Sequence, residues 1–333
     1  MKNLILILSF IVACHFNQYA QCPNAQFTAS GPVCAGSTTV FNNTSTGAIS
    51  YSWDFCAGDF DSLITDTNDV TGFLNTPSGI TPVTDTSGNY VFACSRGDDK
   101  IIRYDYGNGY ASAPTQITDL GNMLGLVGSP NGIAFYQEGG IWYALVLSVF
   151  NNTATKFDFT NGLNAPPTAG AVVVSSSLNF PRGLELQSDA SGNVIAVIAN
   201  FIGSSLTIVD FGNSINNVPV VSAPYALSGG GAIDVAVVKD CGNWYAFASC
   251  YSSNDVYIVD FGNSLLNAPV SNTQLFAGLA NPAGVSVVRD NDNWFVLAAN
   301  STNGKVNVQN LGSSLSAATP TLIGNVELGG GGP

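Results

Sequence analysis

The chain has 333 residues, of which 46% are hydrophobic and 9% are charged. This composition supplies enough apolar side chains for a large core, and it excludes an intrinsically disordered protein, in which hydrophobicity is low and charge is high. The formal net charge is −13, with only nine Lys and Arg residues. Nucleic acids and anionic membranes are bound through basic surfaces, so neither is expected as a partner.

The first 20 residues have the pattern of an export signal. Lys2 precedes an apolar run over residues 4–13, which is too short to span a bilayer. Cleavage is expected near Ala20, which places the protein outside the cell or on the outer-membrane surface. The alternative is a lipoprotein signal, because residues 11–14 have the form of a lipobox that ends at Cys14.

Cysteine and histidine usage narrows the chemistry of the exported chain. Six of the seven cysteines follow the signal, and an even number in an exported protein indicates up to three disulfides, with buried free thiols as the alternative. The only histidine, His15, lies in the signal, so a Ser-His-Asp triad and a His-ligated metal site are excluded. The disulfide candidates, whose pairing stays open, are Cys22, Cys34, Cys56, Cys94, Cys241 and Cys250.

Residues 21–76 have two interpretations. The run from Phe41 to Ser45, followed by residues 49–55, resembles a PKD-type immunoglobulin-like domain, although residues 56–60 replace the Gly-Asp-Gly turn of that family. Trp53-Asp54-Phe55 also has the form of the third strand of a repeat unit that lies upstream of the clear copies. The segment is therefore predicted as a PKD-like module or as an irregular first blade.

From residue 77 to residue 328 the chain repeats a unit of about 50 residues five times. The copies open with a Pro-x-Gly-like step, and the Gly positions are spaced by 53, 51, 51 and 50 residues. Repeats of this length that are built from short strands are typical of a β-propeller. The openings are Pro77-Ser78-Gly79, Pro130-Asn131-Gly132, Pro181-Arg182-Gly183, Ala232-Ile233-Asp234 and Pro282-Ala283-Gly284.

The third copy shows how one unit becomes a blade. Strands are predicted over residues 183–186, 194–199, 206–211 and 220–227, with Gly-, Asn- and Ser-rich turns between them. The second strands are apolar along their whole length, which indicates burial on both faces between stacked blades. We therefore predict an all-β propeller of four-stranded blades, with five clear repeats and a sixth, irregular blade from the N-terminal segment. Residues 329–333 are Gly-rich and are predicted to be a linker or tail toward further sequence.

Breaks in the repeat pattern are the candidates for function. In a propeller the first strands line the central channel, so Asn131, Arg182, Glu185 and Asp234 are expected to gather near its mouth. A polar ligand, a sugar or a cation could use them. The competing interpretation is a structural ion pair or a solvated rim.

Two other patterns have a structural reading that is favoured over a functional one. Asp66 with Asp69, and Asp290 with Asp292, offer oxygen ligands that suit calcium, but Asp and Asn are also ordinary turn residues, and no other cofactor is expected. Trp142, Trp244 and Trp294 share one repeat position, which favours packing between blades over stacking on a sugar.

The export signal, the PKD-like start and the repeats together resemble surface proteins of Bacteroidota, including gliding-motility adhesins of the type IX system; the repeats are distantly similar to NHL-type propellers. The resemblance implies a non-enzymatic propeller that binds a cell-surface glycan or protein, with secretion or gliding components as further partners. One alternative is a propeller hydrolase, lactonase or lyase that uses carboxylate-bound calcium. Another is a passive spacer or secretion-partner module. The sequence does not specify the ligand or the oligomeric state.

Overall fold

The computed structural model describes residues 27–29, 41–43, 73–110, 113–290 and 292–327. The chain divides into two compact units, residues 1–63 and residues 64–333. In the first unit, β1 (Phe27–Ala29) and β2 (Phe41–Asn43) pair with each other as antiparallel strands. The predicted export signal, the remainder of the PKD-like segment and the expected sixth blade lie outside the described residues.

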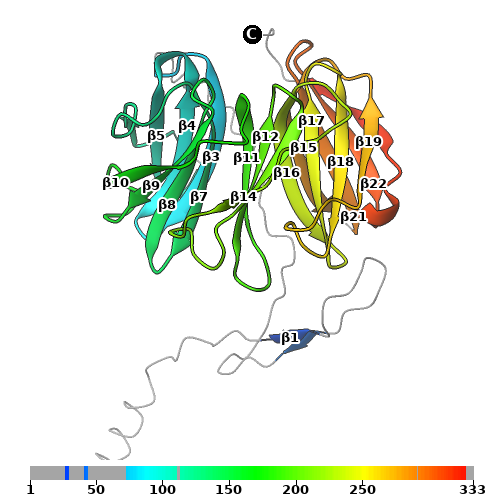
Figure 1. Ribbon diagram of the computed structural model, residues 1–333, viewed down its shortest axis with the longest axis horizontal. Coiled ribbons are helices and arrows are strands. Elements are labelled where there is room, and N and C mark those ends of the chain that lie inside the picture. Colours follow the sequence, from blue (N-terminus) through cyan, green and yellow to red (C-terminus); the bar gives the residue numbers. More distant parts are fainter. Residues whose placement is uncertain (1–26, 30–40, 44–72, 111–112, 291, 328–333) are drawn as a thin grey trace, which may run out of the picture. The chain divides into compact units, whose positions relative to one another are not determined.

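The second unit is a five-bladed β-propeller (Figure 1), which confirms the predicted fold class. In each blade the strands pair in chain order as an antiparallel sheet, and the first strand lies at the centre. The first two blades are β3 (Pro77–Asp85), β4 (Gly88–Ser95), β5 (Lys100–Gly107), β6 (Gln116–Asp119), and β7 (Pro130–Glu138), β8 (Ile141–Ser148), β9 (Thr153–Phe159), β10 (Ala169–Val174).

The third blade differs from the others in its outer strand, which is divided into two short pieces that both pair with the third strand. Its strands are β11 (Pro181–Ser188), β12 (Val194–Asn200), β13 (Ser205–Asp210), β14 (Val220–Val221) and β15 (Tyr225–Ala226). The last two blades are β16 (Ala232–Asp240), β17 (Asn243–Cys250), β18 (Asp255–Gly262), β19 (Ser271–Ala277), and β20 (Pro282–Asp290), β21 (Asn293–Asn300), β22 (Lys305–Gly312), β23 (Thr321–Glu327).

The glycine of the opening step is required by the close approach of neighbouring first strands. A Cβ atom on Gly132 would lie 2.6 Å from the carbonyl oxygen of Arg182, and a Cβ atom on Gly183 would lie 2.6 Å from the Cα of Asp234. These contacts involve backbone, which cannot move aside as a flexible side chain can. The repeat motif therefore records the tight packing of backbones around the axis.

The residue before each first strand has a left-handed backbone in all five blades. Four of these residues are not glycine, so their conformation is costly unless it is held by neighbours. At Ser129, Phe180 and Asn281 a side chain from the preceding blade provides that hold; for example, Asn152 accepts a hydrogen bond from the Phe180 N–H at 2.6 Å, and Asn254 accepts one from the Asn281 N–H at 2.8 Å. The φ values are 52° at Thr76, 49° at Ser129, 57° at Phe180, 70° at Gly231 and 52° at Asn281.

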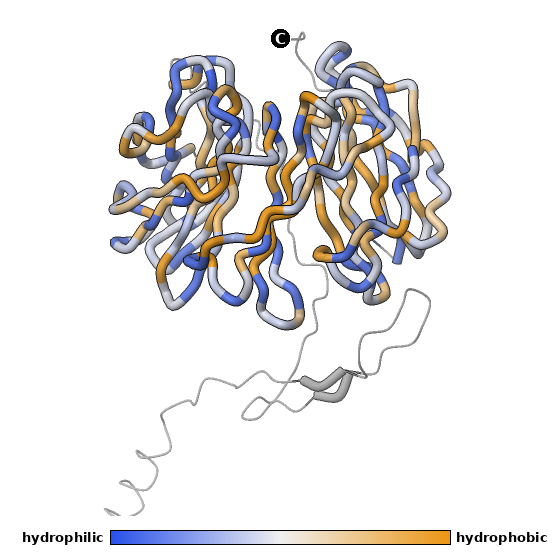
Figure 2. The backbone as a smooth tube through the Cα atoms, viewed as in Figure 1, coloured by the Kyte–Doolittle hydropathy of each residue, from blue (hydrophilic) through white to orange (hydrophobic). Residues whose placement is uncertain are grey.

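The core lies between blades, as the apolar second strands predict. Every residue of β12 is buried, and hydrophobic segments follow the strands whereas hydrophilic ones follow the turns (Figure 2). Trp244 and Trp294 are 5% and 7% exposed within clusters shared by adjacent blades, and Trp142 packs against a third such cluster. The packing role predicted for the three tryptophans is confirmed.

Acidic side chains at the first hairpin of a blade fasten it to the next blade. Glu138 accepts a hydrogen bond from the Ile215 N–H at 3.0 Å, and Asp240 accepts one from the Leu315 N–H at 2.8 Å. The side chains of Ile215 and Leu315 are both buried, and they occupy equivalent places in their repeats. These hydrogen bonds join adjacent blades away from the axis, whereas the close approach of the first strands joins them at the axis.

The disulfide prediction is wrong for two of its cysteines. Cys94 on β4 and Cys250 on β17 are free thiols, each fully buried in a different interblade cluster. Burial raises the pKa of both thiols, that of Cys250 to about 12, so they behave as small apolar side chains. Cys22, Cys34 and Cys56 lie outside the described residues.

Among the residues that are described, no helix is long and apolar enough to cross a membrane.

Two glycines at the same repeat position test the close-approach argument. Gly183→Ala is expected to lower the free energy of unfolding by about 1–3 kcal/mol, because its Cβ must displace backbone of β16. Gly284→Ala is the matched control, since the nearest atom to its Cβ is 3.7 Å away, and it is expected to change stability by less than about 0.5 kcal/mol. Urea unfolding of both variants measures the difference; equal destabilisation would contradict the argument.

Candidate functional site

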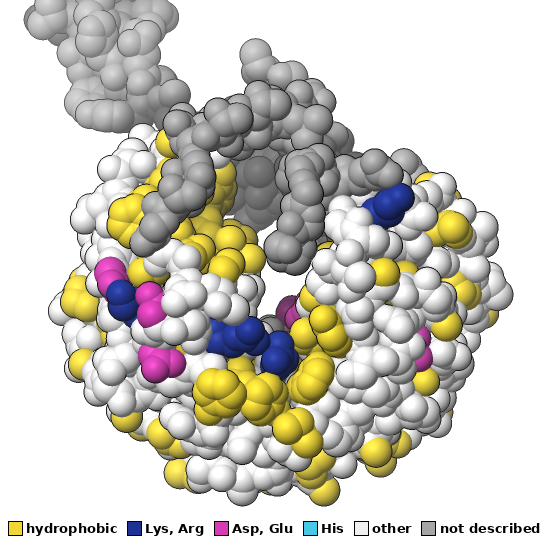
Figure 3. Space-filling model, turned by 90° about the horizontal axis from the view of Figure 1, so that it is seen from above, with side chains coloured by type: hydrophobic (Ala, Val, Ile, Leu, Met, Phe, Trp, Pro, Cys, Tyr) yellow, Lys and Arg dark blue, Asp and Glu magenta, His cyan; other side chains and the backbone are white. Residues whose placement is uncertain are grey.

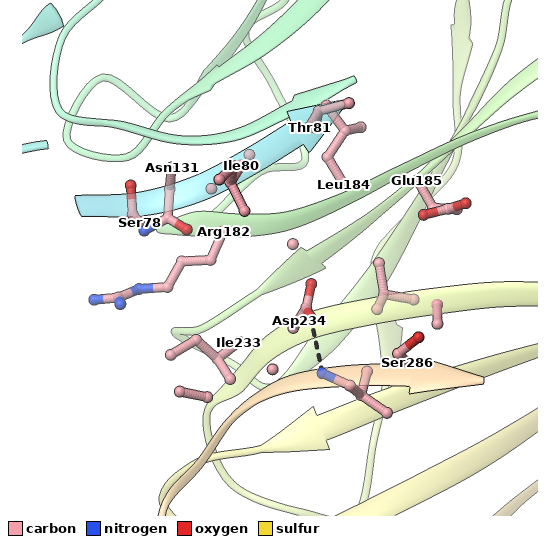
Figure 4. A pocket seen from close by; sticks show the side chains of 18 of the residues that line it. Ser78, Ile80, Thr81, Asn131, Arg182, Leu184, Glu185, Ile233, Asp234 and Ser286 are labelled. Atoms are coloured by element: carbon pink, nitrogen blue, oxygen red, sulfur yellow. Dashed lines mark hydrogen bonds between the residues drawn. The ribbon is translucent and has the colours of Figure 1, made fainter. Parts of the chain in front are cut away.

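The five first strands enclose a cavity of about 840 Å³ along the propeller axis. All four predicted site residues line it: Asn131 on β7, Arg182 and Glu185 on β11, and Asp234 on β16. Figure 4 shows them around one space, with Arg182 and Asn131 toward one end and Glu185 toward the other. The structure thus brings the four together, as the alignment of repeats predicts.

Asp234 occupies the repeat position that is glycine in the other four blades. Its Oδ2 atom accepts a hydrogen bond from the Val285 N–H at 2.9 Å, which joins β16 to β20 (Figure 4). Burial raises the pKa of this carboxyl to about 6, although backbone hydrogen bonds from Val285 and Val235 favour its ionised form. A carboxyl group has therefore replaced a hydrogen atom at one of the five equivalent positions of the channel wall.

Glu185 is the second carboxyl in the cavity. Its Oε1 atom accepts a hydrogen bond from the Gln187 side chain at 3.0 Å, and Gln187 is also within 3.4 Å of the Val237 carbonyl on the next blade. Burial raises the pKa of Glu185 to about 7, the hydrogen bond from Gln187 lowers it, and the negative charge of Asp234 raises it. The side chain is thus oriented by its neighbour and exchanges its proton near neutral pH.

The structural ion pair that competed with a functional interpretation is not formed. Among the described residues, the ion pairs include neither Glu185 nor Asp234, and neither Arg182 nor Arg96. Two acids without a cation and two cations without an acid line the same cavity. Perturbed carboxyls that converge on a cavity mark a candidate active site.

Arg182 lies near the mouth of the channel between two aromatic rings. Its guanidinium carbon is 5.3 Å from the ring centre of Phe180 and 4.8 Å from that of Phe201. Its Nε atom is buried and has no hydrogen-bond acceptor among the described residues. Burial lowers the pKa of Arg182, and the nearby positive charge of Arg96 lowers it further. The cation is held in place by stacking rather than by a counter-ion.

An aromatic arc borders this mouth, and the sequence analysis missed it. The ring centres of consecutive members are 5.6, 6.2 and 6.2 Å apart along Phe150, Phe180, Phe201 and Tyr251. Figure 3 shows basic side chains at the central hollow beside a row of hydrophobic ones. A signal was present: Arg96, Phe201 and Tyr251 each follow the last residue of a second strand, so they are equivalent in the repeat.

Hydroxyl groups on the other wall of the cavity are engaged with neighbouring backbone. The Ser78 hydroxyl donates to the Pro130 carbonyl at 2.8 Å, and the Thr81 hydroxyl donates to the Ile133 carbonyl at 2.5 Å. These bonds fasten β3 to β7. The hydroxyl groups of Ser78 and Thr81 are therefore not free to contact a ligand, unlike the side chains of Glu185 and Asp234 on β11 and β16.

The calcium candidates are not brought together. Asp292 is 83% exposed, has a φ of 66° in the turn after β20, and lies 3.9 Å from Arg289, so Asp290 and Asp292 have the turn role that the sequence favoured. Asp66 and Asp69 lie outside the described residues. No cluster of three or more metal-ligating side chains occurs in the part of the chain that is described. Glu185 and Asp234 alone supply too few ligands for the six to eight that calcium takes.

Comparison with known proteins identifies the fold and contradicts part of the functional prediction. No family model and no curated protein matches the chain. Among solved structures, it is similar to a thermostable family-43 glycoside hydrolase, with 12% identity, a TM-score of 0.51, and coverage of 78% of this chain and 96% of that one. It is also similar to a candidate 6-phosphogluconolactonase from Bacteroides fragilis, with 15% identity, a TM-score of 0.51, and coverage of 74% and 69%.

A third similar structure is larger than this chain. It is an exo-β-1,3-galactanase from Phanerochaete chrysosporium, with 11% identity, a TM-score of 0.43 and coverage of 59% of this chain. The chain spans about half of that enzyme's length, 49%. At such identities the likeness establishes the propeller fold alone.

The prediction of a non-enzymatic adhesion propeller, and with it the prediction that the chain is not an enzyme, is contradicted. The two similar propellers with a TM-score of 0.51 are described as a glycoside hydrolase and as a candidate lactonase, so the alternative of an enzyme on a propeller scaffold agrees better with them. The physical error lay in the weight given to the missing histidine. That absence excludes histidine-dependent triads, but a pair of carboxyls can perform acid–base chemistry without one.

Ionisation of the buried Glu185 carboxyl is expected to lower the free energy of unfolding as the pH rises. Its pKa is about 7 in the folded state and about 4.5 ordinarily, so the unfolded chain loses this proton first, and stability falls as the pH passes from about 4.5 to 7. Glu185→Gln is expected to raise the free energy of unfolding by about 1–3 kcal/mol at pH 8, with a smaller gain at pH 5. Urea titrations at both pH values measure this. Asp292→Asn, at an exposed carboxyl, is the control and should show no such gain; a pH-independent effect of Glu185→Gln would contradict the assignment.

Proposed function

We propose that the channel is the active site of a hydrolase that cleaves a polar, sugar-like substrate by general acid–base catalysis. The observation that carries the proposal is the pair of carboxyls, Glu185 and Asp234, which line one cavity and have pKa values raised to about 7 and about 6. Two carboxyls whose environments separate their proton affinities are the minimal equipment for glycoside hydrolysis.

The proton states assign a role to each carboxyl. Glu185 has the higher pKa of the two, so it is the carboxyl that keeps its proton to the higher pH and can donate it to the leaving-group oxygen of a glycosidic bond. Asp234 has the lower pKa and ionises first, and it can remove a proton from the attacking water. Hydrogen bonds from the Val285 N–H to Oδ2 and from the Val235 N–H hold the Asp234 carboxylate in place for that water.

The surroundings of the two carboxyls suit this chemistry. Both are carried by the rigid first strands of adjacent blades, which are packed closely enough to exclude a Cβ atom between them. Gln187 and Val285 orient the reactive oxygens through hydrogen bonds. Groups positioned in this way require little reorganisation when charge develops, which is the main source of catalytic power in such sites.

The fold is compatible with the proposal. The similar propellers that reach a TM-score of 0.51 include a glycoside hydrolase and a candidate sugar-lactone hydrolase. Their identity to this chain is 12% and 15%, so they support the scaffold and not the substrate. The choice of sugar-like substrates follows from the polar lining and the size of the cavity.

Substitution of either carboxyl tests the assignment. Glu185→Gln and Asp234→Asn are each expected to lower kcat/KM by about 10²–10⁴-fold, because each removes one proton-transfer group. The native chain is expected to show a bell-shaped pH profile, with activity falling below about pH 6 as Asp234 is protonated and above about pH 7 as Glu185 ionises. Release of reducing ends from a panel of neutral and acidic oligosaccharides measures both effects.

Two controls separate catalysis from stability. Asp292→Asn removes an exposed carboxyl and is expected to retain full activity. Glu185→Gln is expected to be at least as stable as the native chain, so its loss of activity cannot be attributed to unfolding. Turnover that persists in Glu185→Gln, or the absence of turnover across the whole panel, would contradict the proposal.

A further inference from the structure

We propose that the channel mouth is a subsite for the anionic group of an acidic saccharide, with Arg182 and Arg96 binding the oxyanion and the aromatic arc contacting the sugar ring. This inference names the substrate class of the proposed hydrolase and rests on it to that extent.

In the described part of the chain, Arg96 and Arg182 are the two cations that line the channel. Lys100 lies 3.1 Å from Asp119, Lys156 lies 2.9 Å from Asp158, and Arg289 lies 3.9 Å from Asp292. Arg96 and Arg182 have no such carboxylate among the described residues, although acidic residues outnumber basic ones by 22 to 9 in the chain. Arg103 and Lys239 also have no ion pair among the described residues, but they lie outside the channel lining. Two neighbouring cations without a counter-ion repel one another, and an anionic ligand would relieve that repulsion.

The placement of Arg182 depends on a strained residue. Phe180 has a φ of 57°, which is unusual for a bulky side chain, and the Asn152 side chain holds its N–H at 2.6 Å. In this position the Phe180 ring and the Phe201 ring both contact the guanidinium. Backbone strain of this kind persists at sites where it positions a functional group. A planar guanidinium held between rings offers paired donors that match the oxygens of a carboxylate or a sulfate.

The aromatic arc adds a surface for a sugar ring. Phe150 is 73% exposed at one end of the arc, and Tyr251 at the other end lines the cavity itself. Cores bury such side chains, and the interblade clusters do so for the tryptophans. The aromatic faces offer an apolar surface for the ring of an acidic sugar, and the unpaired arginine beside them offers a positive charge for its anionic group.

The subsite has the right separation from the acid–base pair. Arg182 and Glu185 are three residues apart on β11, which corresponds to roughly 10 Å along a strand. Asp234 lies between them along the channel (Figure 4). An acidic sugar held at the mouth would therefore extend toward the carboxyls without placing its own negative charge beside them.

Binding to the catalytically disabled Glu185→Gln chain tests the inference without turnover. The probes are trigalacturonate, a sulfated galactose oligosaccharide and the neutral, carboxyl-reduced form of trigalacturonate, each followed by calorimetry at two salt concentrations. The full chain is expected to bind at least one anionic probe about tenfold or more tightly than the neutral one, and added salt is expected to weaken that binding. The two anionic probes separate a carboxylate from a sulfate as the preferred group.

Variants at the mouth locate the binding. Arg182→Gln and Arg96→Gln are each expected to weaken binding of the anionic probe by about 10- to 100-fold, as the loss of a charge-assisted hydrogen bond predicts. Arg289→Gln is the matched control, because Arg289 also stacks on an aromatic ring, 5.6 Å from the centre of Trp294, but lies outside the channel. Arg96 takes no part in the arc, so its variant is informative even where Arg182→Gln alters folding.

The outcomes distinguish this inference from the proposed hydrolase. Equal binding of neutral and anionic probes, or unchanged binding in both mouth variants, would overturn the subsite. Glu185-dependent cleavage of neutral sugars with no effect of Arg96→Gln would overturn the subsite and leave the hydrolase. Arginine-dependent binding of an anionic probe with no cleavage by the native chain would support the subsite and contradict the hydrolase.

Discussion

The close approach of neighbouring first strands around the axis is the constraint on which the structure depends. At Gly132 and Gly183 a single added carbon would press against backbone of the next blade. Because the strands meet so closely, their side chains point into one narrow channel, and any polar residue there meets residues from other blades. The same constraint therefore determines the spacing of the repeat and the location of the site.

Asp234 shows what happens where the constraint is relaxed. Its blade abuts Gly284, whose surroundings have space for a further carbon, so the wall tolerates a side chain at this one glycine position. That side chain is a buried carboxyl, and the fold compensates it with a backbone hydrogen bond rather than with a cation. Burial without a cation raises the pKa of Asp234 and of Glu185, which is unfavourable for stability and useful for proton transfer.

The sequence was sufficient to predict the propeller scaffold and the polar residues of the channel, but not the aromatic arc at its mouth. The repeat of Pro-x-Gly steps predicted five clear blades, which are confirmed, and a sixth, irregular one, which falls outside the described residues; aligning the copies placed Asn131, Arg182, Glu185 and Asp234 on one channel. It could not predict the aromatic arc, because the contacts of Phe150 with Phe180 and of Phe201 with Tyr251 form only when consecutive blades are stacked. It also could not separate buried thiols from disulfides, since the interblade environment of Cys94 and Cys250 is a tertiary property.

Charge is distributed along the channel in a way that a uniform polar lining would not produce. Cations lie at the mouth beside aromatic rings, and carboxyls lie deeper, where neighbouring strands desolvate them. If the four groups served only to stabilise the propeller, pairing Arg182 with Glu185 or Asp234 would lower the electrostatic cost of both, and the strand spacing keeps them apart instead. A protein that maintains this separation leaves two carboxyls and two arginines unneutralised, and the proposed hydrolase with an anionic subsite at the mouth would use both sets of groups.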